Sequence, residues 1–573
     1  MIEDVYEPLA RYRDEFCQKF ATLVREKFKE LTSKAGVDVE ANRALVKVIK
    51  ALQAKADSAD FKATCFGWLI ALSIVGALVA LGVAVFTNDY DPKTSCWCIV
   101  GFIAGAVFCL WMISLYRNAS KLADKLKEQI SRKKFAAWQQ MNPLNQLYTW
   151  DITVKLIEAT VPRLEFDPYF AADRLASLYD QYGWSDSFNR EKSMIYAQSG
   201  VINGNPFVFG HYLDMEWDGK KYEGTKEISW TEWEMDEKGR ERLVRRHETL
   251  HAYVIKPIPV YSEHKFLVYG NDAAPKLSFS REPSGLTGTE DDLFSAIRKK
   301  WRLSRLKAFS RNLDDASNFT LMSNHEFETW FHAKDRDNEV EFRVLFTPVA
   351  QTQMLNLMKD TEVGYGDDFT FLKNKKINLL TSSHLDAATL DTNPLKFHNW
   401  DYDAAAEFFI SFNERYFKDV YFSLAPLLSI PIYQQTRTHE DIWKGVVGNV
   451  PSSFWEHEAI ANFYGAINFT HPSCVTRNIL KTRVLSREDG VSTIEVTAYG
   501  YRGVERVHHE SVYGSDGNWH DVPVPWTEYL PVQNKRTMYI CEGDAPPEAF
   551  RSRADASIKR ALRRSILSYL DKI

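Results

Sequence analysis

The chain has 573 residues, of which 45% are hydrophobic and 13% aromatic, enough for several folded domains. The net charge of −5 gives no electrostatic case for nucleic-acid binding, so no nucleic-acid partner is expected. Of the seven cysteines, Cys65, Cys96, Cys98 and Cys109 lie in or beside two apolar runs. This distribution indicates no disulfide framework and agrees with a reducing cytosol.

Residues 1–62 are expected to form cytosolic helices. Apolar residues recur mostly at three- and four-residue steps up to Leu31, and Gly36 separates this pattern from a second helix at about 39–62. The charged, amphipathic start predicts no cleavable signal peptide, so the first apolar run would itself direct membrane insertion.

Residues 63–116 are predicted to form a transmembrane helical hairpin. Residues 63–86 and 96–116 contain no Asp, Glu, Lys, Arg or His, and each run reaches the roughly 20 apolar residues that cross a bilayer. Small residues follow helical spacing, which allows close packing of the two spans or self-association; these are Gly67, Ala71, Gly76, Ala80, Gly101 and Gly105. The alternative is a hairpin buried in a soluble core.

Basic residues lie on both outer flanks of this hairpin, whereas the connecting loop has only Lys93. The bias predicts an inner (cytoplasmic) membrane protein with both termini in the cytosol. Residues 117–145 then continue as a polar stalk helix that ends at Asn142-Pro143 and pairs with residues 39–62.

The rest of the chain is expected to be α+β, with one cytosolic domain at 150–395 and a second at 396–545. In the first domain, Asn203-Gly204 and Asp218-Gly219 predict turns, and residues 249–256 and 265–269 predict strands. Helices are expected at 290–310 and 349–359, a half-buried strand at 340–346, and a hairpin around 373–376. In the second domain, residues 403–416 predict a helix and residues 478–540 a strand-rich region.

Residues 546–573 are predicted to form a basic amphipathic helix. Its apolar positions recur every four residues, and its basic positions are Lys559, Arg560, Arg563 and Arg564. Such a helix can lie on an anionic membrane surface, and the same pattern fits a helix docked on its own domain.

Residues 324–385 resemble an uncharacterised bacterial family of two-span membrane proteins, a domain of unknown function often encoded beside LemA-type membrane proteins. The residues that carry the resemblance are Glu326, Phe327, Phe331, Asp337, Val340, Glu341, Arg343, Leu345, Thr347, Pro348, Met354, Leu357 and Phe369. The family also places two spans upstream of this domain. The resemblance implies a lipid bilayer and LemA-type proteins as partners, and it implies no activity or catalytic residue.

The one motif with an enzymatic mechanism is His247-Glu248-Thr249-Leu250-His251. On a helix, HExxH places two histidines on one face to bind zinc, with the glutamate as general base. Here the β-branched and aromatic residues that follow, and Pro257 and Pro259, predict a strand, in which the histidines lie roughly 13 Å apart at about 3.3 Å per residue. The sequence therefore predicts no cofactor and a membrane-anchored scaffold or partner-binding protein. The alternative is a membrane-tethered zinc hydrolase that uses His247, Glu248 and His251.

Weaker candidates are incomplete as motifs. His457-Glu458 lacks a second histidine at position 461, and His508-His509-Glu510 is expected to form a polar strand edge. The acidic residues at 364–368 could bind a cation or simply form a helix-to-strand turn.

Overall fold

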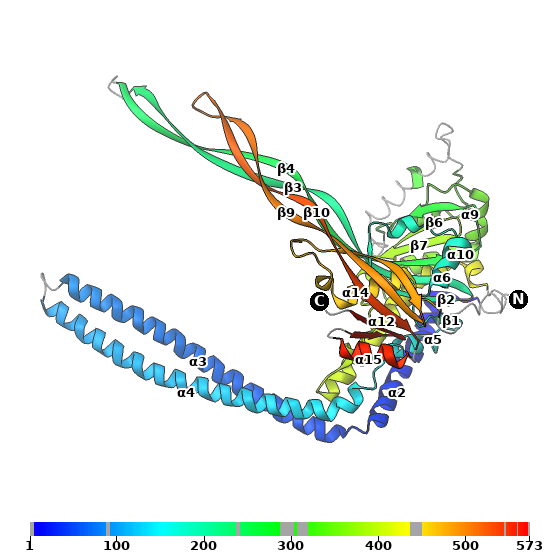
Figure 1. Cartoon of the computed structure of the whole chain (residues 1–573), viewed down its shortest axis with the longest axis horizontal. Helices are drawn as coiled ribbons and strands as arrows, with labels where there is room; N and C mark the ends of the chain where they lie inside the picture. The colour runs from blue at the N-terminus through cyan, green and yellow to red at the C-terminus, as the bar shows by residue number, and fades with distance from the viewer. Residues whose placement is uncertain are drawn as a thin grey trace. The chain divides into compact units, whose positions relative to one another are not determined.

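The computed structural model describes residues 5–87, 92–235, 241–286, 303–305, 319–435, 450–543, 546–557 and 560–570 (Figure 1). Contacts divide the chain into two compact units. Unit 1 comprises Met1–Phe20, Trp150–Thr392 and Glu414–Ile573, and unit 2 comprises Ala21–Thr149 and Asn393–Asn413. Unit 1 thus contains residues from both of the domains expected from the sequence, 150–395 and 396–545.

Unit 2 is built on two long helices, α3 (Val39–Thr87) and α4 (Pro92–Asn145), which lie side by side (Figure 1). The two helices run antiparallel, because residues later in the sequence of α3 contact residues earlier in the sequence of α4. Asp60 pairs with Lys127 at 2.7 Å, Gly67 faces Tyr116, and Ala77 faces Gly105. The predicted pairing of the polar extensions is confirmed by a small core that contains Ile49, Ala56, Ile130 and Ala137. The proline of Asn142-Pro143 lies inside the last turns of α4 and does not end the helix.

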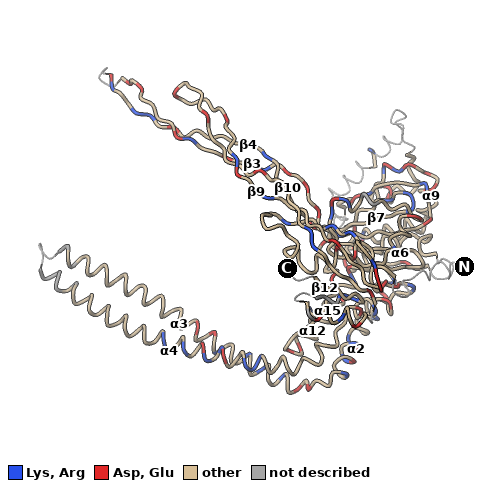
Figure 2. The backbone as a smooth tube through the Cα atoms, viewed as in Figure 1, with Lys and Arg blue, Asp and Glu red and all other residues tan. Residues whose placement is uncertain are grey.

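The apolar halves of α3 and α4 make both helices long and apolar enough to cross a membrane. The most apolar window of each helix is almost fully exposed, with 0% and 6% of its residues buried. Figure 2 shows these halves free of the charged residues that mark the other halves. A hairpin serving as a soluble core would bury this surface, and this one does not.

Residues 393–413 pack against the polar halves of these helices. Asn42 donates to the carbonyl of Trp400, and Arg43 pairs with Asp403 at 2.9 Å. Asn145 donates to the carbonyl of Asn399, which ties down the end of α4. The aromatic residues Phe28, Tyr148, Phe397, Tyr402 and Phe409 fill the space between these helices.

Unit 1 contains two antiparallel sheets. The seven-stranded sheet has the order β1-β2-β3-β4-β7-β6-β5, and the five-stranded sheet has the order β11-β12-β10-β9-β8. The strands of the first sheet are β1 (Leu164–Phe166), β2 (Ser193–Ile202), β3 (Asn205–Met235), β4 (Glu241–Gly270), β5 (Ser278–Arg281), β6 (Phe369–Asn374) and β7 (Ile377–Ser382). The strands of the second sheet are β8 (Ile479–Glu488), β9 (Val491–Tyr513), β10 (Trp519–Glu542), β11 (Arg560–Arg563) and β12 (Ile566–Leu570).

The helices of unit 1 are mostly short. They are α1 (Pro8–Arg11), α2 (Cys17–Ala35, shared with unit 2), α5 (Ile152–Glu158), α6 (Ala172–Asp180), α8 (His325–Phe331), α9 (Glu339–Leu345), α10 (Pro348–Lys359), α11 (Ser383–Ala387), α12 (Tyr402–Leu428, also shared), α14 (Phe454–Tyr464) and α15 (Glu548–Ala556). Helix α14 contributes to both sheet cores. Its Trp455 packs with Phe266 and Val268 of the first sheet, and its Ile460 packs with Ile494 and Ile540 of the second.

Two ribbons project from the sheets and pack on each other over much of their length (Figure 1). We call them the β arm: residues 214–235 and 241–263 of β3 and β4, with residues 500–513 and 519–537 of β9 and β10. Their inner faces share a core of Ile228, Leu250, Ala252, Val522 and Val524. Gly224 lies directly against Pro523, where a side chain would collide with the proline carbonyl.

Several local predictions are confirmed. Asn203 and Gly204 both adopt positive φ between β2 and β3, as Asn-Gly in a tight hairpin turn does. The Thr347 side chain accepts from the N–H of Ala350 at the start of α10. Strands β6 and β7 form the hairpin expected around 373–376, and residues 478–540 are strand-rich. The helix expected at 290–310 lies outside the described residues, apart from 303–305.

Two strand-and-turn predictions in unit 1 are wrong. Residues 340–346 belong to helix α9 and the residue after it, where Phe342 and Phe346 are four positions apart and both buried, while Val340 and Val344 are exposed. Asp218-Gly219 is not a turn, because β3 runs straight through it in unbroken register with β4.

The predicted C-terminal helix is also wrong beyond Ala556, where the chain forms the hairpin β11–β12. A four-residue repeat is also a multiple of two, so Ile566 and Leu570 share one face of a strand as readily as one face of a helix.

Candidate functional site

The HETLH segment lies inside strand β4, as its composition predicts. Each of its residues pairs with β3, from His247 opposite Ser229 to His251 opposite Thr225. The two histidines are exposed on the outer face of the ribbon, and Glu248 points to the inner face. There the Glu248 carboxylate accepts from the backbone N–H and the hydroxyl of Ser515, at 2.8 and 3.1 Å. The geometry separates the glutamate from both histidines and assigns it to the contact between the two ribbons.

The other histidines of the β arm bind carboxylates. His509 pairs with Asp521 at 3.0 Å across the β9–β10 ladder, and His520 pairs with Asp516 at 2.9 Å. His508 contacts Glu510 on the same strand at 3.2 Å. Throughout the described ranges, no group of three His, Cys, Asp or Glu residues is placed to hold a metal ion.

Two of the four basic residues assigned to a membrane surface, Arg563 and Arg564, hold the fold of unit 1 instead. Arg563 is 2% exposed and pairs with the buried Glu456 of α14 at 2.9 Å. Arg564 contacts the same carboxylate at 3.5 Å and donates to the carbonyl of Ala197. Arg560 lies in β11, where only its backbone is described, and Lys559 lies outside the described residues. A surface role for Arg563 and Arg564 is therefore corrected to a buried one.

Helix α14 carries three consecutive buried polar residues, Glu456, His457 and Glu458. Burial raises the pKa of Glu458, which pairs with Lys481 at 2.9 Å and accepts from the backbone N–H of Met194. Burial lowers the pKa of His457 to about 3, so the ring is neutral, and its Nε2 contacts the hydroxyl of Ser452 at 2.9 Å. Met194 belongs to β2 of the first sheet and Lys481 to β8 of the second, so Glu458 fastens α14 to both sheets.

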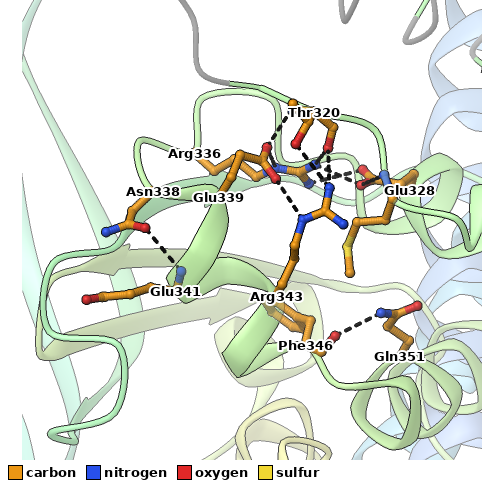
Figure 3. Close-up of polar contacts among 10 residues, drawn as sticks. Thr320, Glu328, Arg336, Asn338, Glu339, Glu341, Arg343, Phe346 and Gln351 are labelled. Atoms are coloured by element: carbon orange, nitrogen blue, oxygen red, sulfur yellow. Dashed lines mark hydrogen bonds and ion pairs between the residues drawn. The ribbon is translucent and has the colours of Figure 1, made fainter.

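A second buried ion-pair network lies in the segment that carries the family resemblance (Figure 3). The Arg336 guanidinium, whose side chain is fully buried, binds Glu328 at 2.8 Å and Glu339 at 2.6 Å, and it donates to the carbonyl of Thr320. Phe319 and Phe342 lie on the guanidinium at 4.2 Å. These contacts join α8, α9 and the segment before α8, so the network orders this part of unit 1.

The arrangement closest to a catalytic triad is Asp368, His384 and Ser423. The Nδ1 of His384 lies 3.0 Å from the Asp368 carboxylate, and its Nε2 lies 3.2 Å from the hydroxyl of Ser423. The Ser423 hydroxyl, however, donates to the carbonyl of Asp419 at 2.8 Å. In this arrangement the hydroxyl proton is directed to the Asp419 carbonyl and not to the imidazole, so the three residues are not set for general-base activation of Ser423.

The polar groups around Asp368, His384 and Ser423 are also bound to other protein groups. Tyr365 stacks on His384 with ring centroids 4.2 Å apart, and its hydroxyl donates to Asp419. Burial raises the pKa of Asp368, but hydrogen bonds from the side chain and backbone of His384 and from Ser383 outweigh it and hold this pKa below its usual value. Asp367 binds the buried Arg281. The two acidic residues at 364–368, Asp367 and Asp368, thus have protein groups as partners.

A cavity of about 320 Å³ lies between the sheet edge and α14 and is lined in part by His211, Lys265, Asn462 and Arg563. Each of these polar groups already has a protein partner. His211 binds Glu263, Lys265 donates to the carbonyl of Asp386, and Asn462 donates to Ser193. Few polar groups of this lining are therefore left to bind a ligand.

The small residues of the predicted spans divide into two groups. Gly105 and Gly67 face the partner helix, with Ala77 and Tyr116 as their nearest contacts. Gly76 and Gly101 have no atom within 4 Å of the position of a side chain. Gly67 and Gly105 therefore lie where α3 packs closely on α4. Ala71 and Ala80 are not among their nearest contacts.

The outer face of the β arm carries exposed apolar residues near the ends of both ribbons. Trp233 and Leu243 are direct cross-strand neighbours near the end of the longer ribbon and are 67% and 52% exposed. Tyr513 and Trp519 form the corresponding exposed pair at the end of the shorter ribbon, with ring centroids 5.4 Å apart. Sequence reasoning missed this surface because it divided β3 and β4 into shorter strands. The alternation that reveals it appears only once residues 214–235 and 241–263 are taken as one ladder.

Comparison of the chain with protein-family models, with curated proteins and with solved structures finds no match.

Proposed function

We propose that the protein is a membrane-anchored scaffold, in which α3 and α4 cross a bacterial cytoplasmic membrane and the β arm binds a partner protein. The exposed apolar halves of α3 and α4 support the anchor, since such a surface is stable in lipid and costly in water. A bilayer is thus the first partner in this proposal.

The proposed orientation places both termini in the cytosol. Arg43, Lys47 and Lys50 precede the first apolar half, and Arg117, Lys121 and Lys125 follow the second. Lysine and arginine near the ends of spans are retained on the cytoplasmic side. The soluble residues of both units then lie in the same compartment.

The single observation that carries the binding role is the exposed apolar pair Trp233–Leu243, with Met235 beside it. Large apolar side chains gathered at the end of a projecting ribbon are unusual on a soluble surface and are typical of protein contact sites. The family resemblance makes LemA-type membrane proteins the partners to test first. The proposal includes no cofactor and no catalytic step.

A photo-crosslinking amino acid placed at Trp233 in the membrane-bound protein tests the binding role. The matched control is the same amino acid at Ile467, an exposed apolar residue next to Asn468, whose carbonyl binds Arg536 at the base of the arm and not at its end. The proposal expects discrete adducts from position 233 that disappear when Leu243 is changed to Ser, and no such adducts from position 467. Equal labelling from both positions, or labelling unchanged by Leu243→Ser, contradicts it.

A further inference from the structure

The four strands of the β arm each have an outer edge that no described strand covers. Pairing stops at Leu213 for β3 with β2, at Leu267 for β4 with β7, at Tyr499 for β9 with β8, and at Met538 for β10 with β12. In an antiparallel ladder, alternate residues direct their N–H and C=O groups away from the partner strand. Where no side chain of the same chain binds them, as Asp214 and Asp218 do on β3 and Lys226 does on β10, these groups can pair with another chain.

Hydrogen bonds near the base of the arm identify the outward-facing residues as the odd-numbered ones. The N–H of Lys265 donates to Asp386, outside the ladder, at 2.8 Å. The N–H of Tyr501 donates to Thr476 at 3.0 Å, and its carbonyl accepts from Val475 at 2.9 Å. The register continues without a shift to the ends of both ribbons, so the same parity holds along the arm.

Three of the four edges carry features that block strand pairing. Proline cannot donate, and the outward positions of β4 and β10 include Pro257, Pro259, Pro523, Pro525 and Pro531. The β3 edge carries Lys220, Lys221 and Lys226, and the carboxylates of Asp214 and Asp218 bind the outward N–H groups of Met215 and Gly219.

The β9 edge differs from the other three. Residues 503–513 contain no proline, lysine or aspartate. The outward residues Glu505, Val507, His509 and Ser511 are all exposed. The charged residues of this edge have both signs, so an edge of this length without proline or lysine is the one most open to pairing with a complementary strand.

We infer that the outer edge of β9 pairs with the same edge of a second copy of this chain, antiparallel about a two-fold axis at His508. A two-fold pairing closes both edges at once and leaves none to propagate. The hydrogen-bonding pattern requires odd residues to face odd residues, which centres the axis on a residue and not between two.

Charge complementarity selects the residue at the centre. With the axis at His508, Arg506 faces Glu510 of the second copy, and the reciprocal pair repeats the contact. Both side chains are exposed, and each would add this contact to its partner in the same chain, which is Glu528 for Arg506 and His508 for Glu510. Centring on Val507 sets Arg506 opposite His508, and centring on His509 sets Arg506 opposite Val512. Only the first of these registers places a carboxylate opposite the guanidinium. This pairing goes beyond the proposed scaffold role and does not depend on it.

Single cysteines at 507, 508 and 509 test the register in the full chain, purified in detergent with the exposed Cys17 changed to Ser. At the axis His508 faces itself in a non-hydrogen-bonded pair, with Cα atoms about 4.5 Å apart, within the range that a disulfide spans. Mild oxidation should convert His508→Cys to a dimer, with at least tenfold less conversion of Val507→Cys and His509→Cys. Absent dimer, or similar conversion at all three positions, overturns the inference.

A proline on the same edge gives an independent test. Ser511→Pro removes an outward N–H and no bond to β10, so the ribbon stays intact while the pairing is lost. The matched control is Ser229→Pro, the same change at an outward position of β3. Light scattering should show wild type and Ser229→Pro as dimers and Ser511→Pro as a monomer. A dimer that survives Ser511→Pro, as association through α3 and α4 would give, or a wild type that is a monomer, contradicts it.

Discussion

Glu248 of β4 accepts two hydrogen bonds from Ser515, a residue in the turn between β9 and β10. The contact fastens the end of the shorter ribbon to the side of the longer one, across 267 positions of sequence. The glutamate that would be the general base of a zinc hydrolase is thereby a structural residue of the β arm.

Glu248→Ala should loosen that turn. Loss of both acceptor contacts in this exposed setting is expected to cost about 1 kcal/mol of stability. Amide hydrogen exchange at Ser515 should accelerate, while exchange in β6 and β7 stays unchanged. His247→Ala, on the opposite face, is the control and should have no effect. Bound zinc that is lost in His247→Ala would instead restore the metal-site hypothesis.

The predicted topology is accessible through fusions. Alkaline phosphatase is active only outside the cytosol, so fusions at either terminus should be inactive, and a fusion near Asp91 should be active, because both basic flanks remain cytosolic. The reverse pattern would require the opposite orientation, and activity at one terminus alone would exclude an even number of spans.

Arg563→Gln should destabilise unit 1. The substitution leaves the buried Glu456 with Arg564 as its remaining cation, and breaking a buried ion pair costs on the order of 3 kcal/mol. Thermal unfolding of detergent-solubilised protein measures the loss. The control Arg553→Gln, at an exposed position of α15, should change stability by less than about 0.5 kcal/mol. If Arg563→Gln weakened binding to anionic liposomes without affecting unfolding, the buried assignment would be wrong.

Arg336→Met should have a similarly large effect. The substitution leaves the buried Glu328 carboxylate without its cation, which should lower the free energy of unfolding by about 3–5 kcal/mol. Arg343→Met, at a half-exposed position beside the same network, should cost less than about 1 kcal/mol. Adding Glu328→Gln to Arg336→Met should recover part of the loss, since no charge then remains unpaired; additive losses in a denaturant titration would contradict this account.

Lys373 should make stability depend on pH. Burial lowers the pKa of its amine to about 7, with the charge of Glu341 opposing the shift, and Nζ donates to the carbonyl of Ala273. The unfolded chain keeps its ordinary pKa near 10.4, so between about pH 7 and 10 it binds the extra proton and stability rises with pH, by up to about 1.4 kcal/mol per unit.

Below the folded pKa this pH dependence ends, because both states are protonated. The unfolding free energy of wild type, measured across this pH range, should therefore rise relative to that of Lys373→Met as the pH increases. Lys375→Met, at the exposed turn of the same hairpin, is the control and should follow wild type. Parallel curves for all three proteins would show that Lys373 keeps its charge throughout.

Sequence reasoning succeeded where one local signal determines the outcome. The length and apolarity of α3 and α4, the Asn203-Gly204 turn and the Thr347 cap each depend on residues close in sequence. It failed where contacts with residues distant in sequence determine the secondary structure or the burial of a side chain. The period-two pattern of Val340, Phe342 and Val344 also fits a helix that buries Phe342 and Phe346 against other phenylalanines. Arg563 looked like a surface residue because Glu456 lies 107 positions away.

The β arm shows the same limit. Asp218-Gly219 and the prolines of β4 normally interrupt strands, but at an uncovered edge an outward position needs no donor, so the ladder continues past them. The candidate surface at Trp233 and Leu243 depends on that continuity. Pairing of residues from two strands is long-range information that neither strand contains alone.

Helices α3 and α4 each pass from an apolar half to a charged half without an interruption in the backbone hydrogen bonding. A continuous helix resists bending, so the apolar half and the charged half of each helix move together as one rigid rod. With polar extensions roughly 35 Å long at about 1.5 Å per residue, a tilt of 10° in the apolar halves would displace the far end of the stalk by about 6 Å. If α3 and α4 cross a membrane as proposed, a change in bilayer thickness or lateral pressure would reach residues 393–413 as movement, without any ligand crossing the membrane.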